Sequence, residues 1–128
     1  MEKITGILKA LSDETRLRIL NLLYQQELCV CDIVETLGIT QAKASRHLIY
    51  MKNAGFLKDR KQAQWVYYAL QQDHQLKFMD HLVYDQLRNM PVCKADLEML
   101  HARLEEKNRA HGELCPCENK RGQSNNER

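Results

Sequence analysis

The sequence predicts a mainly α-helical domain that carries one β-hairpin. Three observations predict this fold class. Apolar residues recur at helical spacing through most of residues 4–55 and 76–104, and the stretch between them, 56–70, has the two-residue period of strands. Glycine and helix-capping residues separate these segments. The chain has 128 residues, which is enough for one domain with its own core.

The composition is that of an ordinary soluble protein, with 44% hydrophobic and 28% charged residues. No apolar run approaches the roughly 18–20 residues of a membrane span, and the N-terminus lacks a signal-peptide pattern. We therefore expect a cytoplasmic protein with no membrane partner, whose five cysteines are thiols or metal ligands. The formal net charge of +2 is too small to identify a nucleic-acid binder. A prediction of nucleic-acid binding must therefore rest on where the charges lie in the sequence.

The first predicted helix has apolar residues at helical spacing: Ile4, Ile7, Leu8 and Leu11. Ser12 is the expected N-cap of the second helix, and Asp13 adds negative charge to its first turn. This second helix is apolar on most sides over residues 17–23, so we expect it to be central. Arg16 and Arg18 are its polar exceptions.

Two further helices follow in the pattern of a helix-turn-helix. The segment from Asp32 to Leu37 reads as a short helix that Gly38 ends with a sharp turn. Thr40 caps the next helix, which extends to about Gly55. One face of that helix is an apolar stripe, Ala44, Leu48, Met51 and Gly55, and the opposite face is polar and basic.

A hairpin is predicted next. Residues 56–60 and 65–70 are rich in strand formers, and the polar residues 61–64 lie between them. No Asn-Gly or Asp-Gly marks a tight turn, so we expect a loop longer than two residues. A hairpin directly after the second helix of a helix-turn-helix is a wing, and the predicted fold is a winged helix-turn-helix.

The C-terminal third contains a nearly heptad apolar stripe that Pro91 interrupts: Leu76, Met79, Val83, Leu87 and Met90. The stripe either packs within the chain or forms a dimer seam with Ile4, Ile7 and Leu8. We favour a homodimer, since two half-sites one helical turn apart suit a symmetric protein, and assign Phe78 and Leu82 to the intramolecular side. Residues 1–110 then form the DNA-binding and dimerisation domain, and 111–128 a flexible, cysteine-containing tail.

The most informative motif is Glu27-Leu28-Cys29-Val30-Cys31-Asp32, which sets two thiols one residue apart. Within a regular helix their side chains would project about 200° apart, whereas in an extended or capping segment they project to one side. The pair can bind one soft ion only if the backbone there is, or becomes, non-helical, and this couples ion binding to the helix that follows. The alternative is that both cysteines only pack.

Three blocks resemble the ArsR/SmtB family of small winged-helix repressors. They are residues 11–20 (Leu-Ser-Asp-Glu-Thr-Arg-Leu-Arg-Ile-Leu), residues 27–32, and Ser45-Arg46-His47-Leu48 together with Trp65-Val66-Tyr67-Tyr68. The middle block is similar to the branch that senses arsenite and antimonite or its neighbour that senses cadmium and lead. The resemblance implies a homodimer that binds operator DNA without any cofactor and leaves it when As(III) or Sb(III) binds, with Cd(II) or Pb(II) as the alternative inducer.

The DNA contacts are expected on the helix after Thr40 and on the wing. Four residues at the start of that helix face the major groove in such a fold, Gln41, Lys43, Ser45 and Arg46, and His47 reaches toward a phosphate. On the wing Arg60, Lys61 and Gln64 suit the DNA backbone or the minor groove. The alternative interpretation is that these residues only form a solvated helix face. The preceding turn and the following wing favour DNA binding over this alternative.

The resemblance implies three sulfurs around arsenite, so a third cysteine is expected in addition to Cys29 and Cys31. The arsenic branch often has it three residues after the second cysteine, where this chain has Val34. Candidates elsewhere are Cys93, Cys115 and Cys117. Cys93 lies on an apolar stripe and is better interpreted as a buried small hydrophobe, while Cys115-Pro116-Cys117 either completes the site or is an incidental dithiol.

Other functions compete with this prediction. A redox signal through the same thiols would make a different repressor. A thiol enzyme using Cys115 and Cys117 lacks a helix-borne Cys-x-x-Cys motif, so we predict that the protein is not an enzyme. An acidic outer face on the helix after Thr40 would have suggested a winged helix that binds another protein. That face is basic in this chain, which argues against this function. We also expect the helix N-terminus near Cys29 and Cys31 to favour their thiolates.

Overall fold

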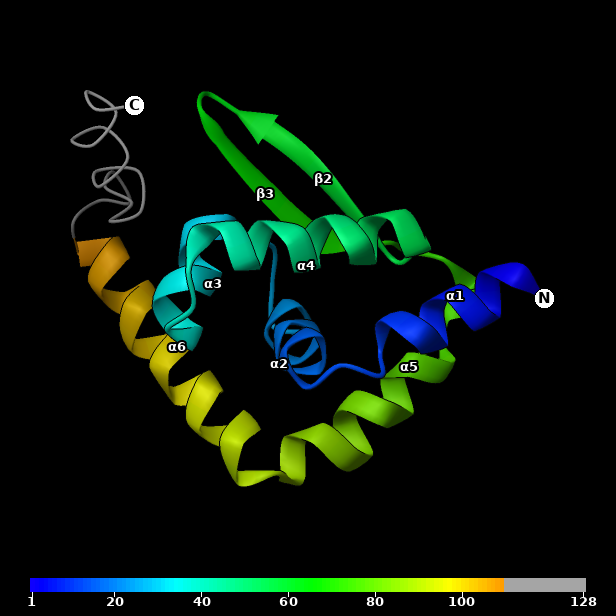
Figure 1. Ribbon diagram of the computed structural model, residues 1–128. Coiled ribbons are helices and arrows are strands. Elements are labelled where there is room, and N and C mark those ends of the chain that lie inside the picture. The colour runs from blue at the N-terminus through cyan, green and yellow to red at the C-terminus, as the bar shows by residue number, and fades with distance from the viewer. Residues whose placement is uncertain (110–128) are drawn as a thin grey trace.

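The computed structural model describes residues 1–109 apart from the side chain of Gln75, so the predicted tail, 111–128, lies outside the described residues. The larger elements are helices α1 (Glu2–Ala10), α2 (Glu14–Leu23), α3 (Val30–Leu37), α4 (Gln41–Ala54), α5 (Phe78–His81) and α6 (Pro91–Arg109), with strands β1 (Leu28–Cys29), β2 (Leu57–Gln62) and β3 (Trp65–Leu70). Figure 1 shows α2 at the centre, between α4 and the α5–α6 segment, and the β2–β3 hairpin extending beyond α4. The predicted mainly helical, winged fold is confirmed.

Helix α2 is central, as its apolar composition predicts. Ile19, Leu20 and Leu22 are completely buried. The predicted N-cap was wrong by one residue, because Asp13 accepts the 3.0 Å bond from the amide of Arg16. Ser12 instead donates its hydroxyl to the Lys9 carbonyl at the end of α1, at 2.7 Å.

The helix-turn-helix is formed by α3 and α4. The turn contains Gly38 with φ 68°, in the left-handed region that favours glycine. Thr40 caps α4 by accepting a 3.1 Å bond from the Lys43 amide, as predicted. The predicted apolar stripe of α4 packs on the core, and three of its members are completely buried: Ala44, Leu48 and Met51.

The wing belongs to a three-stranded sheet of order β1-β3-β2, in which both pairs of neighbours are antiparallel. Strand β1, which the sequence analysis did not predict, pairs Cys29 with Tyr67. The expectation of a longer hairpin loop was wrong, since Gln62 pairs with Trp65 and leaves only two residues between the strands. Ala63 makes this tight turn with φ 56°, although it is not glycine.

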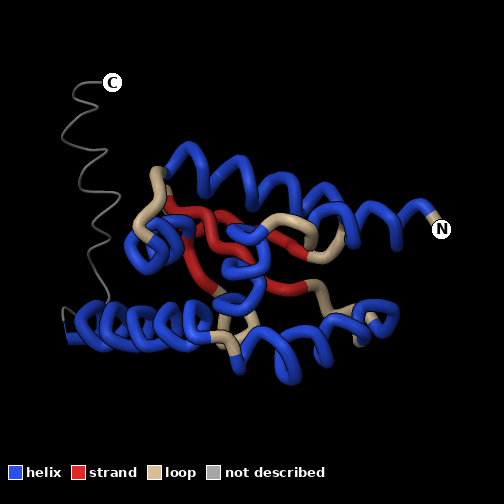
Figure 2. The backbone as a smooth tube through the Cα atoms, turned by 60° about the horizontal axis from the view of Figure 1, so that its bottom comes forward, coloured by secondary structure: helices blue, strands red, loops and turns tan. Residues whose placement is uncertain are grey.

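The C-terminal segment is less regular than its apolar stripe predicts. A 3₁₀ turn (His74–Leu76), α5, a π-helical turn (Leu82–Gln86) and a second 3₁₀ turn (Leu87–Asn89) replace one continuous helix before Pro91, the first residue of α6. Figure 2 shows the helices on both sides of the strands. No helix within residues 1–109 is both long and apolar enough to cross a bilayer.

The predicted dimer seam is wrong for most of its residues. Four of them are at most 4% exposed within the single chain and belong to its main core: Leu76, Met79, Val83 and Leu87. Ile7 is also buried, whereas Met90, Ile4 and Leu8 are exposed. Phe78, assigned to the intramolecular side, is 39% exposed. The irregular turns rotate the faces of this segment, which a single helical period could not anticipate.

Candidate metal centre and nucleic-acid interface

The two cysteines of the Cys-x-Cys pair meet at the junction between β1 and α3. Cys29 has extended backbone (φ −84°, ψ 164°) as the N-cap of α3, whereas Cys31 lies in the first turn of the helix. Their sulfur atoms are 2.6 Å apart. Helix α3 starts earlier than predicted, yet the sulfurs converge, because only Cys29 has to be non-helical.

Asp32 connects this junction to the end of α6. One of its carboxylate oxygens accepts the Cys29 amide at 3.0 Å, and the other accepts Arg103 Nε at 3.0 Å and Lys107 Nζ at 2.9 Å. Asp32 is 2% exposed. Burial by itself would raise the pKa of this carboxyl, but Lys107, the Cys29 amide and Arg103 together hold the pKa below its usual value.

The electrostatic expectation for the thiols was wrong for Cys29. Burial raises the pKa of the Cys29 thiol above its ordinary value, and the nearby Asp32 charge raises it further. Lys107, whose Nζ lies 3.8 Å from the Cys29 sulfur, opposes both. Desolvation outweighs the position at a helix N-terminus, so Cys29 holds its proton more firmly than an exposed cysteine would.

The pair lies in a groove between α4 and the wing. The groove has a volume of about 400 Å³, and α4 contributes Gln41, Ser45 and Ile49 to its lining. The wing contributes Lys61, Gln64 and Trp65. Trp65, Tyr67 and Val34 pack against the buried cysteines in a cluster separate from the main core. The indole N–H of Trp65 is buried and has no hydrogen-bond partner within the described residues.

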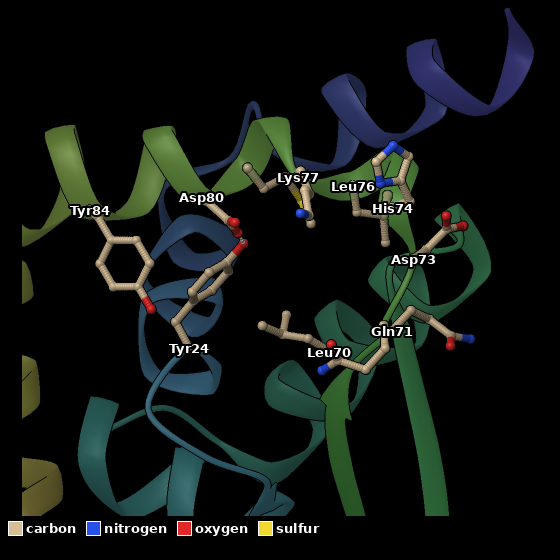
Figure 3. Close-up of a pocket in the computed structure, with 11 residues that line it drawn as sticks. Tyr24, Leu70, Gln71, Asp73, His74, Leu76, Lys77, Asp80 and Tyr84 are labelled. Carbon is tan, nitrogen blue, oxygen red and sulfur yellow. Dashed lines mark hydrogen bonds between the residues drawn. The ribbon is translucent and has the colours of Figure 1, made fainter.

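A second cavity, of about 510 Å³, lies between Tyr24 and the segment from Leu70 to Tyr84 (Figure 3). The Tyr24 hydroxyl donates to Asp80 at 2.6 Å, and its ring meets the edge of Tyr84 at a centroid distance of 5.5 Å. Burial and then the Asp80 carboxylate raise the pKa of Tyr24. Among the described residues no cysteine lines this cavity, so the groove with the cysteine pair is the better candidate for a soft ion.

The predicted DNA-contact residues of α4 lie on three different sides of the helix. Lys43 and Arg46 are exposed on the outer face, and Gln41 and Ser45 are half-buried toward the wing groove. His47 is half-buried on the opposite flank, where its Nδ1 lies 3.2 Å from Arg16 Nη1. Because arginine only donates, this ring nitrogen accepts, and the proton of a neutral His47 is on Nε2.

The surroundings of His47 lower its pKa below the ordinary value. Burial lowers its pKa, and Arg16, Lys43 and Arg46 lower it further against the opposing charge of Asp13. The permanent positive charge beside His47 on this flank is that of Arg16.

The three predicted wing residues are exposed, but they differ in their contacts. Arg60 makes two bonds to the Glu27 carboxylate, at 2.7 and 2.8 Å, and its guanidinium lies 4.7 Å from the centre of the Tyr67 ring. Lys61 and Gln64 lie near the hairpin tip and line the thiol groove. Glu27 thus holds the Arg60 guanidinium within the chain.

Cys93 lies apart from the pair. Cys93 is 1% exposed and packs in the main core, as its apolar interpretation predicts. Cys115 and Cys117 lie outside the described residues. Within residues 1–109 no three side chains of His, Cys, Asp or Glu gather closely enough to hold a metal ion.

Sequence reasoning missed four residues of these sites. Asp32 was recoverable from the spacing Cys29-x-x-Asp32, which matches the geometry of a capping box. Arg103 and Lys107 come from a helix more than seventy residues away and have no local signal. Trp65 was assigned only to a strand, and its contact with the thiols depends on the unpredicted strand β1.

Fold and site together define a winged helix-turn-helix protein with a cysteine pair in a groove beside α4. The family model described as "Bacterial regulatory protein, arsR family" matches residues 13–59. The structure of HlyU from Vibrio cholerae is 36% identical and superposes with a TM-score of 0.58 over 66% of this chain and 94% of that one. The chain belongs to the ArsR family.

Two curated relatives are named for resistance to different ions. The chain is 51% identical to the arsenical resistance operon repressor of Escherichia coli over 65 residues, which are 50% of this chain and 56% of that protein. It is 43% identical over 72 residues to a CadC homolog of Staphylococcus aureus named for cadmium resistance, which covers 56% of this chain and 60% of that one. The chain thus spans little more than half the length of these two relatives.

Proposed function

We propose that this protein is a transcriptional repressor that trivalent arsenic or antimony releases from operator DNA by binding the thiolates of Cys29 and Cys31. The observation that carries the proposal is the convergence of the two sulfurs, 2.6 Å apart, in the groove shared by α4 and the wing. Thiolates are the ligands that soft ions prefer. No cofactor is required for the DNA-bound state.

The position of the pair supports a direct route from ion to DNA. Cys29 belongs to β1, which pairs with β3 of the wing, and Cys31 belongs to α3, which packs on α4. An ion bonded to both sulfurs therefore fixes the spacing between the wing and the helix-turn-helix. If DNA requires a different spacing, ion binding lowers DNA affinity, and a coupling of about 1–3 kcal/mol corresponds to roughly 5–150-fold.

A tail cysteine is our proposal for the third sulfur. Helix α6 ends at Arg109, and Lys107 in its last turn contacts the Cys29 sulfur at 3.8 Å. Cys115 is six residues beyond Arg109. This short separation in sequence from the turn that contacts Cys29 supports the proposal.

For DNA we retain the predicted contacts on α4 and the wing. Lys43 and Arg46 are exposed on the outer face of α4, and Gln41, Ser45 and His47 lie along its two flanks. Lys61 and Gln64 extend this surface to the wing, and Arg60 joins it when Glu27 releases its guanidinium. Base edges would be read by the start of α4, and phosphates by the flanks and the wing.

We also propose that the protein acts as a homodimer. The exposed apolar residues Ile4 and Leu8 of α1 and Phe78 of α5 replace the buried stripe as candidates for the subunit interface. A symmetric dimer presents two copies of α4 to two half-sites, which is the usual arrangement for helix-turn-helix repressors. Light scattering on the full chain measures the mass directly, and a monomeric mass at the concentrations that bind DNA would contradict the dimer.

Cadmium or lead is the second candidate inducer, and the similarity to the CadC homolog favours it. The same two thiols would bind it. The ions are separable because each can be titrated alone while DNA release is followed, and the more effective ion identifies the inducer.

The test compares Cys29→Ser/Cys31→Ser with Cys93→Ser, a matched change at a buried cysteine outside the groove. The probe is a duplex selected by the wild-type protein from a random library. Both variants are expected to bind this duplex, and only the double variant should stay bound when arsenite is added. The single tryptophan, Trp65, lies against the thiols, so its fluorescence should respond to arsenite in the wild type and in Cys93→Ser alone. If arsenite still releases the double variant from the duplex, Cys29 and Cys31 are not the inducer site.

A further inference from the structure

We propose that Arg16, held beside α4, binds a phosphate of the DNA backbone on the flank of α4 that faces away from the wing. This inference rests on the proposed DNA binding and adds a residue that the sequence pattern marked only as a polar exception in a buried helix. It assigns the positive charge of this flank to α2 rather than to His47 of α4.

The guanidinium of Arg16 is fixed in place from three sides. Its Nε donates to the carbonyl of Ala10 at 2.7 Å, and its Nη1 lies 3.2 Å from Nδ1 of His47. The group also lies 4.3 Å from the centre of the Tyr50 ring. These contacts hold a long side chain in one position, so binding a phosphate there loses little side-chain entropy.

Arg16 retains donors for a ligand. A guanidinium has five N–H groups, and two of those of Arg16 are engaged by Ala10 and His47. No carboxylate bonds the Arg16 side chain within the described residues, whereas Arg18, Arg60 and Arg103 each bond an Asp or Glu. The preferred additional partner of such a preorganised guanidinium is an anion such as phosphate.

The position on α4 also fits the shape of DNA. An α-helix with its side chains is about 10–12 Å across, and the major groove is about 12 Å wide, so both flanks of the helix face a phosphate strand. The wing occupies one flank, toward Gln41 and Ser45. On the other flank lie His47 and Tyr50, and Tyr50 is 44% exposed beside Gly6 of α1. Arg16 is the cation that α2 adds to this second flank.

A structural role is the competing interpretation, because Arg16 also joins the α1–α2 turn to α4. Arg88 provides a matched control. It too is stacked on a half-exposed tyrosine, Tyr84, at 5.2 Å, and bonds Asn21 at 2.7 Å, but it lies in the turn before α6. In Figure 1 this turn is on the side of α2 opposite α4.

The experiment measures binding of the full-length protein to a mixed-sequence duplex of about 30 base pairs, long enough for two half-sites. Affinity is determined over a series of salt concentrations for the wild type, Arg16→Met, Arg16→Lys and Arg88→Met. We expect Arg16→Met to bind about 3–10-fold more weakly and to reduce the salt slope by about one per protomer, as loss of one phosphate contact does. Arg16→Lys should recover most of the slope, and Arg88→Met should retain all of it.

The outcomes separate this inference from the proposed function. If Arg16→Met weakens binding without changing the salt slope, Arg16 is structural and the inference fails while DNA binding stands. If Arg88→Met lowers the slope equally, the effect is a general one of stability and the inference also fails. If the wild type shows no salt-dependent DNA binding, the proposed function itself fails.

Discussion

The two ends of α6 are fixed to the rest of the molecule by similar chemistry. Near its start, Asp96 accepts bonds from Arg18 of α2 at 2.8 and 2.9 Å. Near its end, Arg103 and Lys107 donate to Asp32 of α3 at 3.0 and 2.9 Å. Each carboxylate also follows a buried cysteine by three residues, Cys93 before Asp96 and Cys29 before Asp32.

The surroundings of the two cysteines differ. Cys93 packs in the main core, and its carbonyl meets Asn21 at 3.4 Å. Cys29 has a second sulfur beside it and lines the groove between α4 and the wing. A buried cysteine next to an ion pair is therefore not a candidate site by itself. What distinguishes Cys29 is the second sulfur and the groove, since soft ions prefer sulfur ligands.

The largest expected effect is a difference in protein stability between variants of the two carboxylates, Asp32 and Asp96. Asp32→Asn leaves Arg103 and Lys107, whose side chains are 11% and 16% exposed, without their buried charge partner. We expect a loss of about 3–5 kcal/mol in the free energy of unfolding, as for other broken buried pairs. Asp96→Asn should lose only about 1–3 kcal/mol, because Arg18 is 25% exposed and stays partly hydrated. Urea unfolding followed by circular dichroism measures both.

The same two variants test the link to the thiols. Asp32→Asn also alters the acceptor of the Cys29 amide, so it should change the arsenite response of the Trp65 fluorescence. Asp96→Asn should respond as the wild type does. Equal losses of stability with equal arsenite responses would show that the two ends of α6 do not differ in function.

The sequence alone predicted most of the fold for identifiable reasons. The helix-turn-helix followed from local signals, the left-handed turn at Gly38 and the Thr40 cap, and both are present. The wing followed from its two-residue period. Strand β1 was missed because two residues carry no period, and the tight turn at Ala63 was missed because alanine rarely adopts positive φ.

The candidate site was only half predictable. Cys29 and Cys31 are recognisable by spacing, but their partners Asp32, Arg103 and Lys107 depend on how α6 packs against α3. The dimer seam failed for a related reason. A stripe at heptad spacing identifies a buried face, but it does not tell whether the same chain or a second subunit covers that face. Here Leu76 and Val83 are buried within one chain.

A smaller effect is expected in acid. The folded state holds the pKa of Asp32 below the value of about 3.9 in an unfolded chain, so its ionised form favours folding at all higher pH. This contribution is lost as the pH falls through the lowered folded-state pKa. Urea midpoints between pH 6 and 2.5 should therefore fall more steeply for the wild type than for Asp32→Asn. A residual slope from Asp13, whose pKa is lowered chiefly by its bond to the Arg16 amide, should remain in both. Parallel pH profiles would contradict the role of the Asp32 charge.

The smallest effect on stability is expected at an exposed ion pair beside the same thiols. Glu27 and Arg60 have side chains 35% and 49% exposed, so hydration replaces most of their attraction when the pair is broken. Glu27→Gln should leave the urea midpoint unchanged within error. It should strengthen DNA binding about twofold and steepen the salt dependence, because it removes a negative charge from the wing and frees Arg60 for phosphate. A loss of stability as large as that of Asp96→Asn would mean that burial does not distinguish these ion pairs. Unchanged DNA binding would instead place Arg60 outside the DNA interface.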